Sequence, residues 1–321
     1  MYHFIMNPSA SSGKGMNVWK QIQEILDKEQ VVYEQHVLKS AKETTLFVRE
    51  LTKLSENENA EMVNQSRGSE DVHIVVLGGD GTINTVLNGI EDFSRTILSC
   101  IRTGSGNDFA RNVGITKDVK EAINHLLHEP EEQCLDYGIV KYETDGKRKK
   151  RRFVISSGVG YDADICEEVS RSVLKKRLNR IRLGKMVYLA IGVKQIFSRE
   201  VTGAVIRMDD NIEIKIPELF FVVGMIHERE GGGVPFCPKA DATDGKLDVC
   251  LVQNMPRWKL LLAVMLVYIK KHYIFKKITE HQCQSMSIEL EKPQWFHMDG
   301  ETPCRVQKLE LQCQSGLRFC K

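Results

Sequence analysis

The chain has 321 residues, enough for two domains, and its 42% hydrophobic and 27% charged content is ordinary for a soluble globular protein. A net charge of +2 gives no basic signature of the kind that nucleic-acid-binding proteins carry, so nucleic acid is not expected as a partner. The nine cysteines are an odd number without a Cys-x-x-Cys pair, which indicates reduced thiols in a cytoplasmic protein and neither a disulfide framework nor a cysteine-based zinc site.

The first part of the chain alternates strand and helix signals, which predicts an α/β domain with a parallel sheet and helices on both faces. The segment 1–6 is too short and uncharged for a signal peptide. The expected strands are 2–6, 31–38, 72–77 and 96–101. The expected helices are 16–29, 41–54, 83–90 and 119–127, and 55–70 is expected to be an exposed loop.

After about residue 131 the pattern changes to strands separated by turns, which predicts a second, mainly antiparallel β domain. Its expected strands are 134–142, 152–158, 202–208, 212–216, 219–223, 247–252 and 285–290. Helical signals interrupt them at 163–197 and 256–274. The basic run in 143–152 is interpreted as a charged hairpin tip, with contact to a membrane or an anionic substrate as the alternative.

The apolar stretch 260–269 has basic residues on both sides. Ten residues cannot cross a bilayer as a helix, so no transmembrane segment is expected. The favoured interpretation is a core helix with basic ends, and the alternative is a surface that rests on anionic lipid.

The most informative stretch is 72–84, in which an apolar strand runs into Gly78, Gly79 and Gly81. Thr82 is predicted to cap the helix that follows, and a glycine loop before a helix N-terminus is a geometry that binds phosphate. An acid beside phosphate suggests an intervening cation, so Asp80 points to Mg²⁺. Asp80 is expected to face solvent and to add little to stability, and a plain glycine turn is the alternative.

Two more loops follow predicted strands. The segment from Asn7 to Gly15 is small and contains glycine, which suits a loop around a nucleotide phosphate tail, although it lacks Walker A spacing. The segment 104–108 offers the polar groups of Ser105, Asn107 and Asp108 at the same sheet edge. An ordinary loop and a plain turn with Asn107 or Asp108 capping a helix are the respective alternatives.

Far along the chain, Asp299-Gly300-Glu301 places two acids around a glycine. A carboxylate there can accept a proton from a hydroxyl nucleophile as it attacks phosphorus. A common Asp-Gly turn is the alternative.

Together, these four segments resemble the diacylglycerol/lipid kinase catalytic family of bacterial soluble lipid kinases and their sphingosine- and ceramide-kinase relatives. The resemblance runs nearly end to end. It implies a Rossmann-like or phosphofructokinase-like nucleotide domain at 1–131, to which 306–321 returns, and a β-sandwich lipid-substrate domain at 132–305. It also implies an active site in the cleft between them.

The resemblance implies ATP as phosphoryl donor and Mg²⁺ as the metal. Glu301 would be the proton acceptor with Asp299 beside it, the less favoured base, and Asp80 would help hold Mg²⁺ on the phosphates. A structural Mg²⁺ would be held by the Asp244 side chain and the backbone carbonyls of Asp241 and Lys246, with an Asp-Gly turn as the alternative. The implied nucleotide-binding residues are Asn7, Pro8, Ser9, Gly13, Gly78, Gly79, Asp80, Gly81, Thr82, Asn84, Gly104, Ser105, Asn107 and Asp108.

The sequence departs from the family at Arg102, where proline is frequent, which puts backbone rigidity in doubt, and at Leu38, where many members have a threonine. The function expected is an ATP-dependent lipid kinase, with diacylglycerol as the expected acceptor and phosphatidic acid as its product. The alternatives are NAD kinase or another small-molecule kinase, and a non-catalytic nucleotide-binding regulator. The expected partner is a lipid substrate, met by a cytoplasmic protein transiently peripheral to the membrane; a homodimer stays open.

Overall fold

The computed structural model describes residues 1–6, 15–53, 71–104, 106–171, 184–209 and 211–321. The chain divides into two compact units. The first contains 1–135 together with 315–321, and the second contains 136–314. The loop residues Asn7, Pro8, Ser9, Gly13 and Ser105 lie outside the described residues.

The first unit is built on a parallel sheet whose strand order is β4-β3-β1-β2. The last residues of β13 (Arg305–Cys320) add a further parallel strand beside β4, with Arg318 opposite Ile97. Buried apolar runs explain why β1, β3 and β4 form inner strands of a sheet that is covered on both faces, whereas β2 is a more exposed edge strand. The bounds are β1 (Tyr2–Met6), β2 (Tyr33–Val37), β3 (Val72–Gly78) and β4 (Thr96–Arg102).

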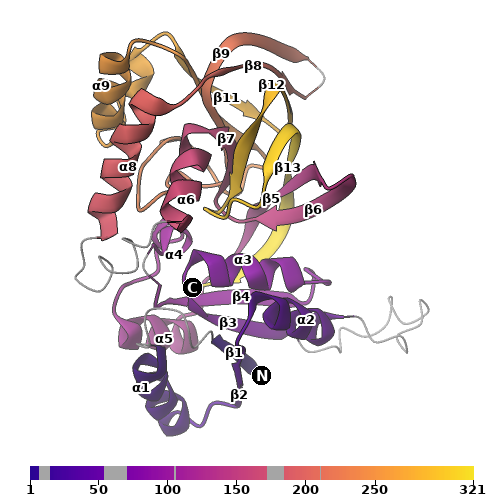
Figure 1. Ribbon diagram of the computed structural model, residues 1–321. Helices are drawn as coiled ribbons and strands as arrows, with labels where there is room; N and C mark the ends of the chain where they lie inside the picture. Colours follow the sequence, from indigo (N-terminus) through magenta and orange to yellow (C-terminus); the bar gives the residue numbers. More distant parts are fainter. Residues whose placement is uncertain (7–14, 54–70, 105, 172–183, 210) are drawn as a thin grey trace. The chain divides into compact units, whose positions relative to one another are not determined.

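Helices lie on both faces of this sheet, with α2 and α3 on one face and α1 and α5 on the other (Figure 1). Trp19, Ile22 and Leu26 follow a helical spacing and pack on strand residues such as Phe4 and Val75. Helix α5 begins after Asp118, whose side chain accepts hydrogen bonds from two backbone N–H groups. The bounds are α1 (Gly15–Lys28), α2 (Ala41–Thr52), α3 (Asp80–Gly89), α4 (Asp108–Asn112) and α5 (Val119–His128).

The second unit is an antiparallel β-structure with strand order β11-β10-β9-β7-β12-β13. Strand β8 pairs with both β9 and β12, and β5 pairs with β13 and β6. The bounds are β5 (Glu132–Thr144), β6 (Lys147–Phe153), β7 (Ser156–Gly160), β8 (Thr202–Met208), β9 (Ile212–Met225), β10 (Leu247–Gln253), β11 (Ile278–Cys283) and β12 (Ser285–Met298).

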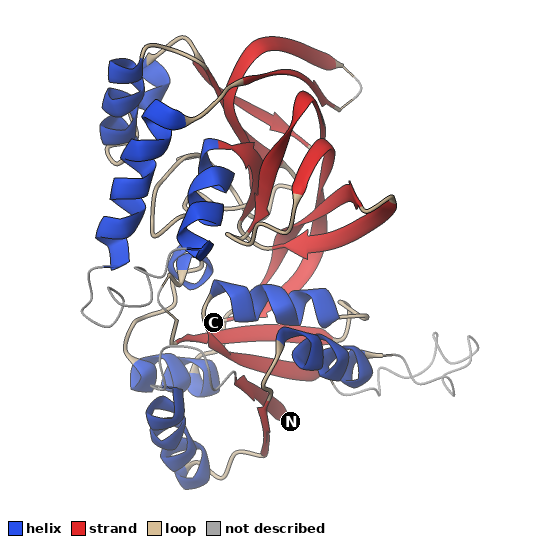
Figure 2. Ribbon diagram, in the orientation of Figure 1, coloured by secondary structure: helices blue, strands red, loops and turns tan. Residues whose placement is uncertain are grey.

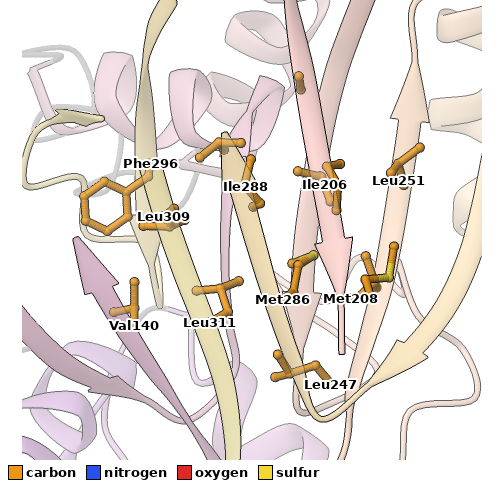
Figure 3. Packing of buried hydrophobic residues seen from close by; sticks show 14 of the residues in the cluster. Val140, Ile206, Met208, Leu247, Leu251, Met286, Ile288, Phe296, Leu309 and Leu311 are labelled. Carbon is orange, nitrogen blue, oxygen red and sulfur yellow. The ribbon is translucent and has the colours of Figure 1, made fainter. Parts of the chain in front are cut away.

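Alternate residues of these strands fill one apolar core, in which Ile206, Ile288 and Leu309 are fully buried (Figure 3). Helices α6 and α8 pack on each other, and α8 packs on α9 (Figure 2). Their bounds are α6 (Tyr161–Arg171), α8 (Gly184–Ser198), α9 (Arg257–Val267) and the 3₁₀ turn η2 (His272–Ile274). Among the described helices, none combines the length and apolar character that a membrane span requires.

The fold class agrees with the prediction of an α/β domain followed by a β-rich domain, but several elements differ. The predicted strand 152–158 spans the end of β6 and the start of β7, because Val154 and Ile155 leave the extended conformation and separate the two strands. The predicted helix 163–197 contains α6 and α8, which are separate elements, and 256–274 ends its α-helix at Val267. Strand β9 runs continuously where two strands were expected, and β11 was not predicted.

Candidate active site

The first glycine loop joins β3 to α3, and most of its residues belong to the first turn of that helix. Helix α3 begins at Asp80 with Gly79 as N-cap, and the N–H groups of Thr82 and Ile83 both donate to the Gly79 carbonyl oxygen. The prediction that Thr82 caps the helix is therefore wrong, because Thr82 already lies in its first turn. The Thr82 side chain lies over Gly78, where an added Cβ would come within 2.6 Å of the Thr82 Cβ. Only glycine fits that position without a shift.

The second loop follows β4 and lies directly against the first. An added Cβ at Gly104 would come within 2.5 Å of the Gly79 Cα, so the two backbones touch glycine to glycine. Asn107 adopts a left-handed conformation with φ 54°. Its amide donates to the Gly104 carbonyl oxygen at 2.7 Å and its Oδ1 accepts from the Gly104 N–H at 3.0 Å. Asn107 therefore holds the loop closed with the polar groups that were expected to face a nucleotide.

Asp80 connects the two loops. Its carboxylate accepts hydrogen bonds from the backbone N–H groups of Asp108, at 3.1 Å, and Phe109, at 3.0 Å. These are unpaired donors at the start of α4, so an acid is favoured there. The expectation that Asp80 faces solvent is wrong, because the side chain is part-buried and fastens one loop to the other. These hydrogen bonds also argue against the expectation that Asp80 adds little to stability.

The other residues of the first unit that were predicted to bind the nucleotide differ in exposure: some lie in open space and others are buried. At Gly81 an added Cβ would meet no atom within 4 Å, so this first-turn position is open. Asn84 is fully buried within α3, and its carbonyl and side-chain oxygens accept from the Asn88 amide. Asp108 is buried and pairs with Arg111. The structure thus brings 78–82 and Gly104 together with Asn107 and Asp108, whereas Asn84 points into the protein.

Arg102 supports the second loop in the place where the family often has proline. Its guanidinium donates to the carbonyl oxygens of Ile115, at 3.0 Å, and Asn107, at 3.5 Å. Side-chain hydrogen bonds to backbone carbonyls restrict the loop in a way that proline would achieve by fixing φ. The concern that Arg102 leaves the backbone loose is therefore not supported.

In the second unit, Asp299 and Gly300 form a two-residue turn at the start of the connection between β12 and β13. Their φ angles are 46° and 82°, and Met298 and Glu301 exchange backbone hydrogen bonds across the turn at 2.9 Å. Positive φ at both central residues is typical of a tight hairpin turn. The Asp299 carboxylate accepts from the N–H groups of Val154, Ile155 and Ser156 at 2.8–3.1 Å. Asp299 thus accepts the hydrogen bonds of the backbone N–H groups where the chain passes from β6 to β7.

Glu301 has a different environment, although it is only two residues away. Its side chain is 45% exposed and pairs with Arg151 at 3.0 Å. Arg151 comes from the basic run, which forms the predicted hairpin with Asp145 and Gly146 at its turn. Sequence reasoning missed Arg151 as a neighbour of Glu301, because 150 residues separate them and any of the six basic residues of the hairpin fitted the pattern equally well.

A buried polar network lies next to this turn and was also missed. His297 Nε2 is 2.9 Å from the Asp162 carboxylate at the start of α6, and Ser156 Oγ donates to Glu230. Ser157 Oγ donates to the His297 carbonyl oxygen at 2.7 Å. Burial alone would lower the pKa of His297, but the charge and hydrogen bond of Asp162 outweigh it and raise the pKa to about 9. The network fastens His297, which precedes the turn, and Ser156, whose backbone N–H donates to Asp299.

The predicted structural metal site is a turn in which the side chains mostly bond their own backbone. Asp241 Oδ1 accepts from the Thr243 N–H and hydroxyl, and Asp244 Oδ1 accepts from the Lys246 N–H at 3.0 Å. Beside the turn, Asp248 is buried and its Oδ2 has no partner among the described residues. An orphaned buried carboxylate oxygen beside two exposed acids fits a hard cation that takes oxygen ligands. The Mg²⁺ assignment stays a prediction.

Comparisons with known proteins agree with these features. Residues 1–135 match the diacylglycerol kinase catalytic domain, and residues 155–314 match the YegS C-terminal NAD kinase beta sandwich-like domain. The chain is 26% identical over 311 residues to the "Putative lipid kinase YtlR" of Bacillus subtilis, covering 95% of this chain and 96% of that protein. It is 24% identical over 233 residues to a diacylglycerol kinase of Mycobacterium tuberculosis, covering 72% and 71% of the two chains.

The fold is also that of a solved structure, a "putative diacylglycerol kinase" from Bacillus anthracis, with a TM-score of 0.73 at 19% identity. That likeness covers 99% of this chain and 96% of the other. Two adjacent family models, a relative matched over almost the whole length and a shared fold point to the same assignment. The chain belongs to the diacylglycerol/lipid kinase family and is a kinase.

Proposed function

We propose that this kinase uses ATP and Mg²⁺ to phosphorylate a lipid hydroxyl, with diacylglycerol as acceptor and phosphatidic acid as product. The glycine loops at 78–82 and 104–108 would hold the nucleotide phosphates, which backbone N–H groups and a helix N-terminus favour. A bound Mg²⁺ would neutralise phosphate charge during transfer. The names of relatives such as the Mycobacterium tuberculosis diacylglycerol kinase support this acceptor.

The observation that carries the chemical assignment is the contrast between the two late acids. Asp299 has three backbone donors on its carboxylate, so its oxygens are already occupied. Glu301 is exposed and has one side-chain partner, Arg151. A general base needs an oxygen free to approach the substrate hydroxyl. We therefore assign the proton acceptor to Glu301 and the holding of the turn to Asp299.

The acceptor is tested by incubating the protein with labelled ATP, Mg²⁺ and extracted membrane lipids and identifying the labelled product by mass spectrometry. Labelled phosphatidic acid is the expected result. A different labelled lipid would keep the lipid-kinase assignment and replace the acceptor. In a parallel incubation that contains NAD, label transferred to NAD with none in the lipid fraction would overturn the lipid-kinase assignment.

A lipid acceptor requires that the enzyme meet a bilayer, and α9 offers a surface for this. In the described chain, thirteen large apolar side chains are exposed, and six of them lie between 258 and 274: Trp258, Leu262, Met265, Tyr268, Ile269 and Ile274. Trp258 is 62% and Met265 is 70% exposed. An exposed apolar cluster of this density marks an interaction surface.

The helix has two apolar faces rather than one. At about 100° per residue, Trp258, Leu262 and Met265 fall within about 60° of each other. The buried residues Leu260, Ala263 and Val267 lie on the opposite side and pack into the second unit. The buried face agrees with the interpretation of a core helix, and the exposed face is the one to which the lipid interpretation applies.

The charges around the exposed face support an anionic bilayer as its occupant. Lys259, Lys271, Lys276 and Lys277 surround it, and none makes an ion pair with another described residue. Lys259 Nζ lies 5.3 Å from the centre of the Trp258 ring. Two copies packed through this face would oppose like charges, whereas an anionic bilayer would neutralise them. We propose that α9 lies on anionic lipid, with Trp258 and Tyr268 at headgroup depth, and that the enzyme is otherwise cytoplasmic.

Sedimentation with phosphatidylcholine vesicles, with and without phosphatidylglycerol, tests this surface. Wild type should bind the anionic vesicles, and Met265→Glu should weaken that binding about tenfold or more by placing a charge in the apolar layer. Val32→Glu is the matched control, because Val32 is 69% exposed in the first unit. Equal loss in both variants, or none in Met265→Glu, would contradict the proposal.

A second measurement needs no change of charge. Trp258 fluorescence should shift to the blue on anionic vesicles, and the shift should disappear in Trp258→Phe. Turnover of detergent-dispersed diacylglycerol tests the acceptor separately from membrane docking. If wild type dimerises and Met265→Glu is monomeric while neither binds vesicles, the face is a contact between copies instead.

A further inference from the structure

Three side chains that no part of the kinase chemistry uses meet at the edge of the first sheet. His3 lies on β1, and Glu34 and His36 lie on the edge strand β2. In the parallel pairing, His3 is opposite Glu34 and Ile5 is opposite His36. Because side chains alternate along a strand, all three project from one face, the face on which the Phe47 ring of α2 lies 4.3 Å from the His36 ring.

The three facing atoms form a nearly equilateral triangle. His3 Nδ1 is 3.3 Å from His36 Nε2, and Glu34 Oε2 is 3.4 Å from the first and 3.5 Å from the second. These separations exceed the usual length of a hydrogen bond, about 2.7–3.2 Å. A tetrahedral cation with bonds of about 2.0–2.1 Å holds its ligand atoms about 3.3–3.4 Å apart. The triangle therefore has the size of one face of a zinc coordination shell.

Hydrogen bonding alone does not explain this arrangement. A hydrogen bond satisfies one pair of atoms, whereas each of these atoms faces two others at nearly the same distance. An imidazole nitrogen and a carboxylate oxygen are both donor atoms for a transition-metal ion, and all three facing atoms are of these types.

The only other such cluster among the described residues differs in this respect. Asp162, Glu230 and His297 are all buried, but His297 is hydrogen-bonded to Asp162 at 2.9 Å, and Ser156 donates a hydrogen bond to Glu230. That cluster is a hydrogen-bonded network. The cluster of His3, Glu34 and His36 has no contact that short.

We propose that His3, Glu34 and His36 bind a divalent transition-metal ion, of which Zn²⁺ is the representative. Two imidazoles and a carboxylate are a donor set that zinc accepts, with water at the fourth corner. The Glu34 side chain is 52% exposed, so the ion has a path from solvent, while His3 is buried. The ion would fasten the edge strand β2 to β1, and it would act independently of phosphoryl transfer.

Metal-stripped protein titrated with Zn²⁺ against a chromophoric chelator tests the site. Wild type should bind one Zn²⁺ per chain, and Glu34→Gln and His36→Gln should each weaken it about tenfold or more. Replacing Zn²⁺ with Co²⁺ should give the visible absorption of a tetrahedral complex, and this should be lost in His36→Gln. Glu34→Gln is the decisive variant, because Glu34 is exposed and its replacement should leave the fold intact. A substitution of buried His3 could unfold the protein instead.

His125→Gln is the matched control. His125 Nδ1 lies 3.7 Å from Glu129 on the surface of α5, so this pair has one imidazole and one carboxylate but no second histidine. Its loss should leave Zn²⁺ affinity unchanged. Wild type that binds no Zn²⁺, or Glu34→Gln and His36→Gln that bind it as tightly as wild type, would overturn the proposal. None of these measurements depends on kinase activity.

Discussion

Asp299→Asn and Glu301→Gln should have opposite effects, although the two acids are neighbours in one turn. Asp299 Oδ2 accepts from Val154 and Oδ1 from Ile155 and Ser156. Asparagine has one carbonyl oxygen, so at most the Oδ1 partners are kept and an NH₂ group is turned against the Val154 N–H. A hydrogen bond to a charged group contributes about 1.5–3 kcal/mol. Losing the Val154 hydrogen bond and removing the charge from the Ile155 and Ser156 hydrogen bonds should lower the free energy of unfolding by about 2–4 kcal/mol.

This cost should appear as a lower melting temperature. The second unit spans roughly 180 residues, for which each kcal/mol shifts Tm by about 2–4 °C. We expect Asp299→Asn to melt about 5–15 °C below wild type. Glu301→Gln removes an exposed ion pair with Arg151, which contributes about 0–1 kcal/mol, so Tm should change by no more than about 3 °C.

Turnover should follow the opposite order. Glutamine keeps the shape of Glu301 but cannot accept a proton, so kcat should fall by about 10²–10⁴ while ATP affinity stays near that of wild type. Differential scanning fluorimetry and a coupled ATP assay on the same preparations measure both quantities. If Asp299→Asn melts with wild type and abolishes turnover while Glu301→Gln stays active, the roles are reversed and the reasoning from hydrogen-bond occupancy is refuted.

Three further predictions concern other parts of the two units. Asp80→Ala should lose kinase activity and also speed hydrogen exchange at the Asp108 and Phe109 amides, since both donate to Asp80; unchanged exchange there would contradict the role in joining the loops. Added Mg²⁺ should raise the Tm of wild type but not of Asp244→Ala, and an equal rise in both would place the cation elsewhere. His297 has its pKa raised to about 9, so its pair with Asp162 should stabilise fully below about pH 6.5 and weaken as pH rises through 9. The difference in Tm between wild type and His297→Gln should therefore narrow as the pH rises through 9. A difference that stays constant with pH would argue against a stabilising charged pair between His297 and Asp162.

The inner strands β1, β3 and β4 of the first unit were predictable because burial on both faces leaves an apolar run in the sequence. Val72 to Leu77 is such a run, and the observed β3 extends it by only Gly78. β11 escaped prediction because Thr279, Glu280, His281 and Gln282 are polar and its pairing with β10 is decided by the partner strand.

Side-chain roles were less predictable than side-chain identities. Asp80, Asp299 and Glu301 stand out in the sequence, but the donors that occupy two of them come from distant segments, as with Asp299 and the 154–156 backbone. Thr82 was assigned a cap because a threonine before an apolar helix is a strong local signal. The helix begins earlier because the Gly79 carbonyl oxygen already accepts from both the Thr82 and Ile83 N–H groups. His3, Glu34 and His36 become neighbours only through strand register, which no local pattern contains.

The return of β13 to the first sheet has a consequence for how the protein is made. Residues 315–321 complete a unit whose other residues are synthesised before the whole of 136–314. They contribute bonds on which that unit depends: Arg318 pairs with Asp71 and Glu132, and the Cys320 carbonyl oxygen accepts from Ser99. On the ribosome, the nascent nucleotide domain must therefore wait, with the edge of β4 uncovered, until the second domain has emerged. A fragment ending at residue 135 would keep that exposed edge permanently and should be prone to aggregation.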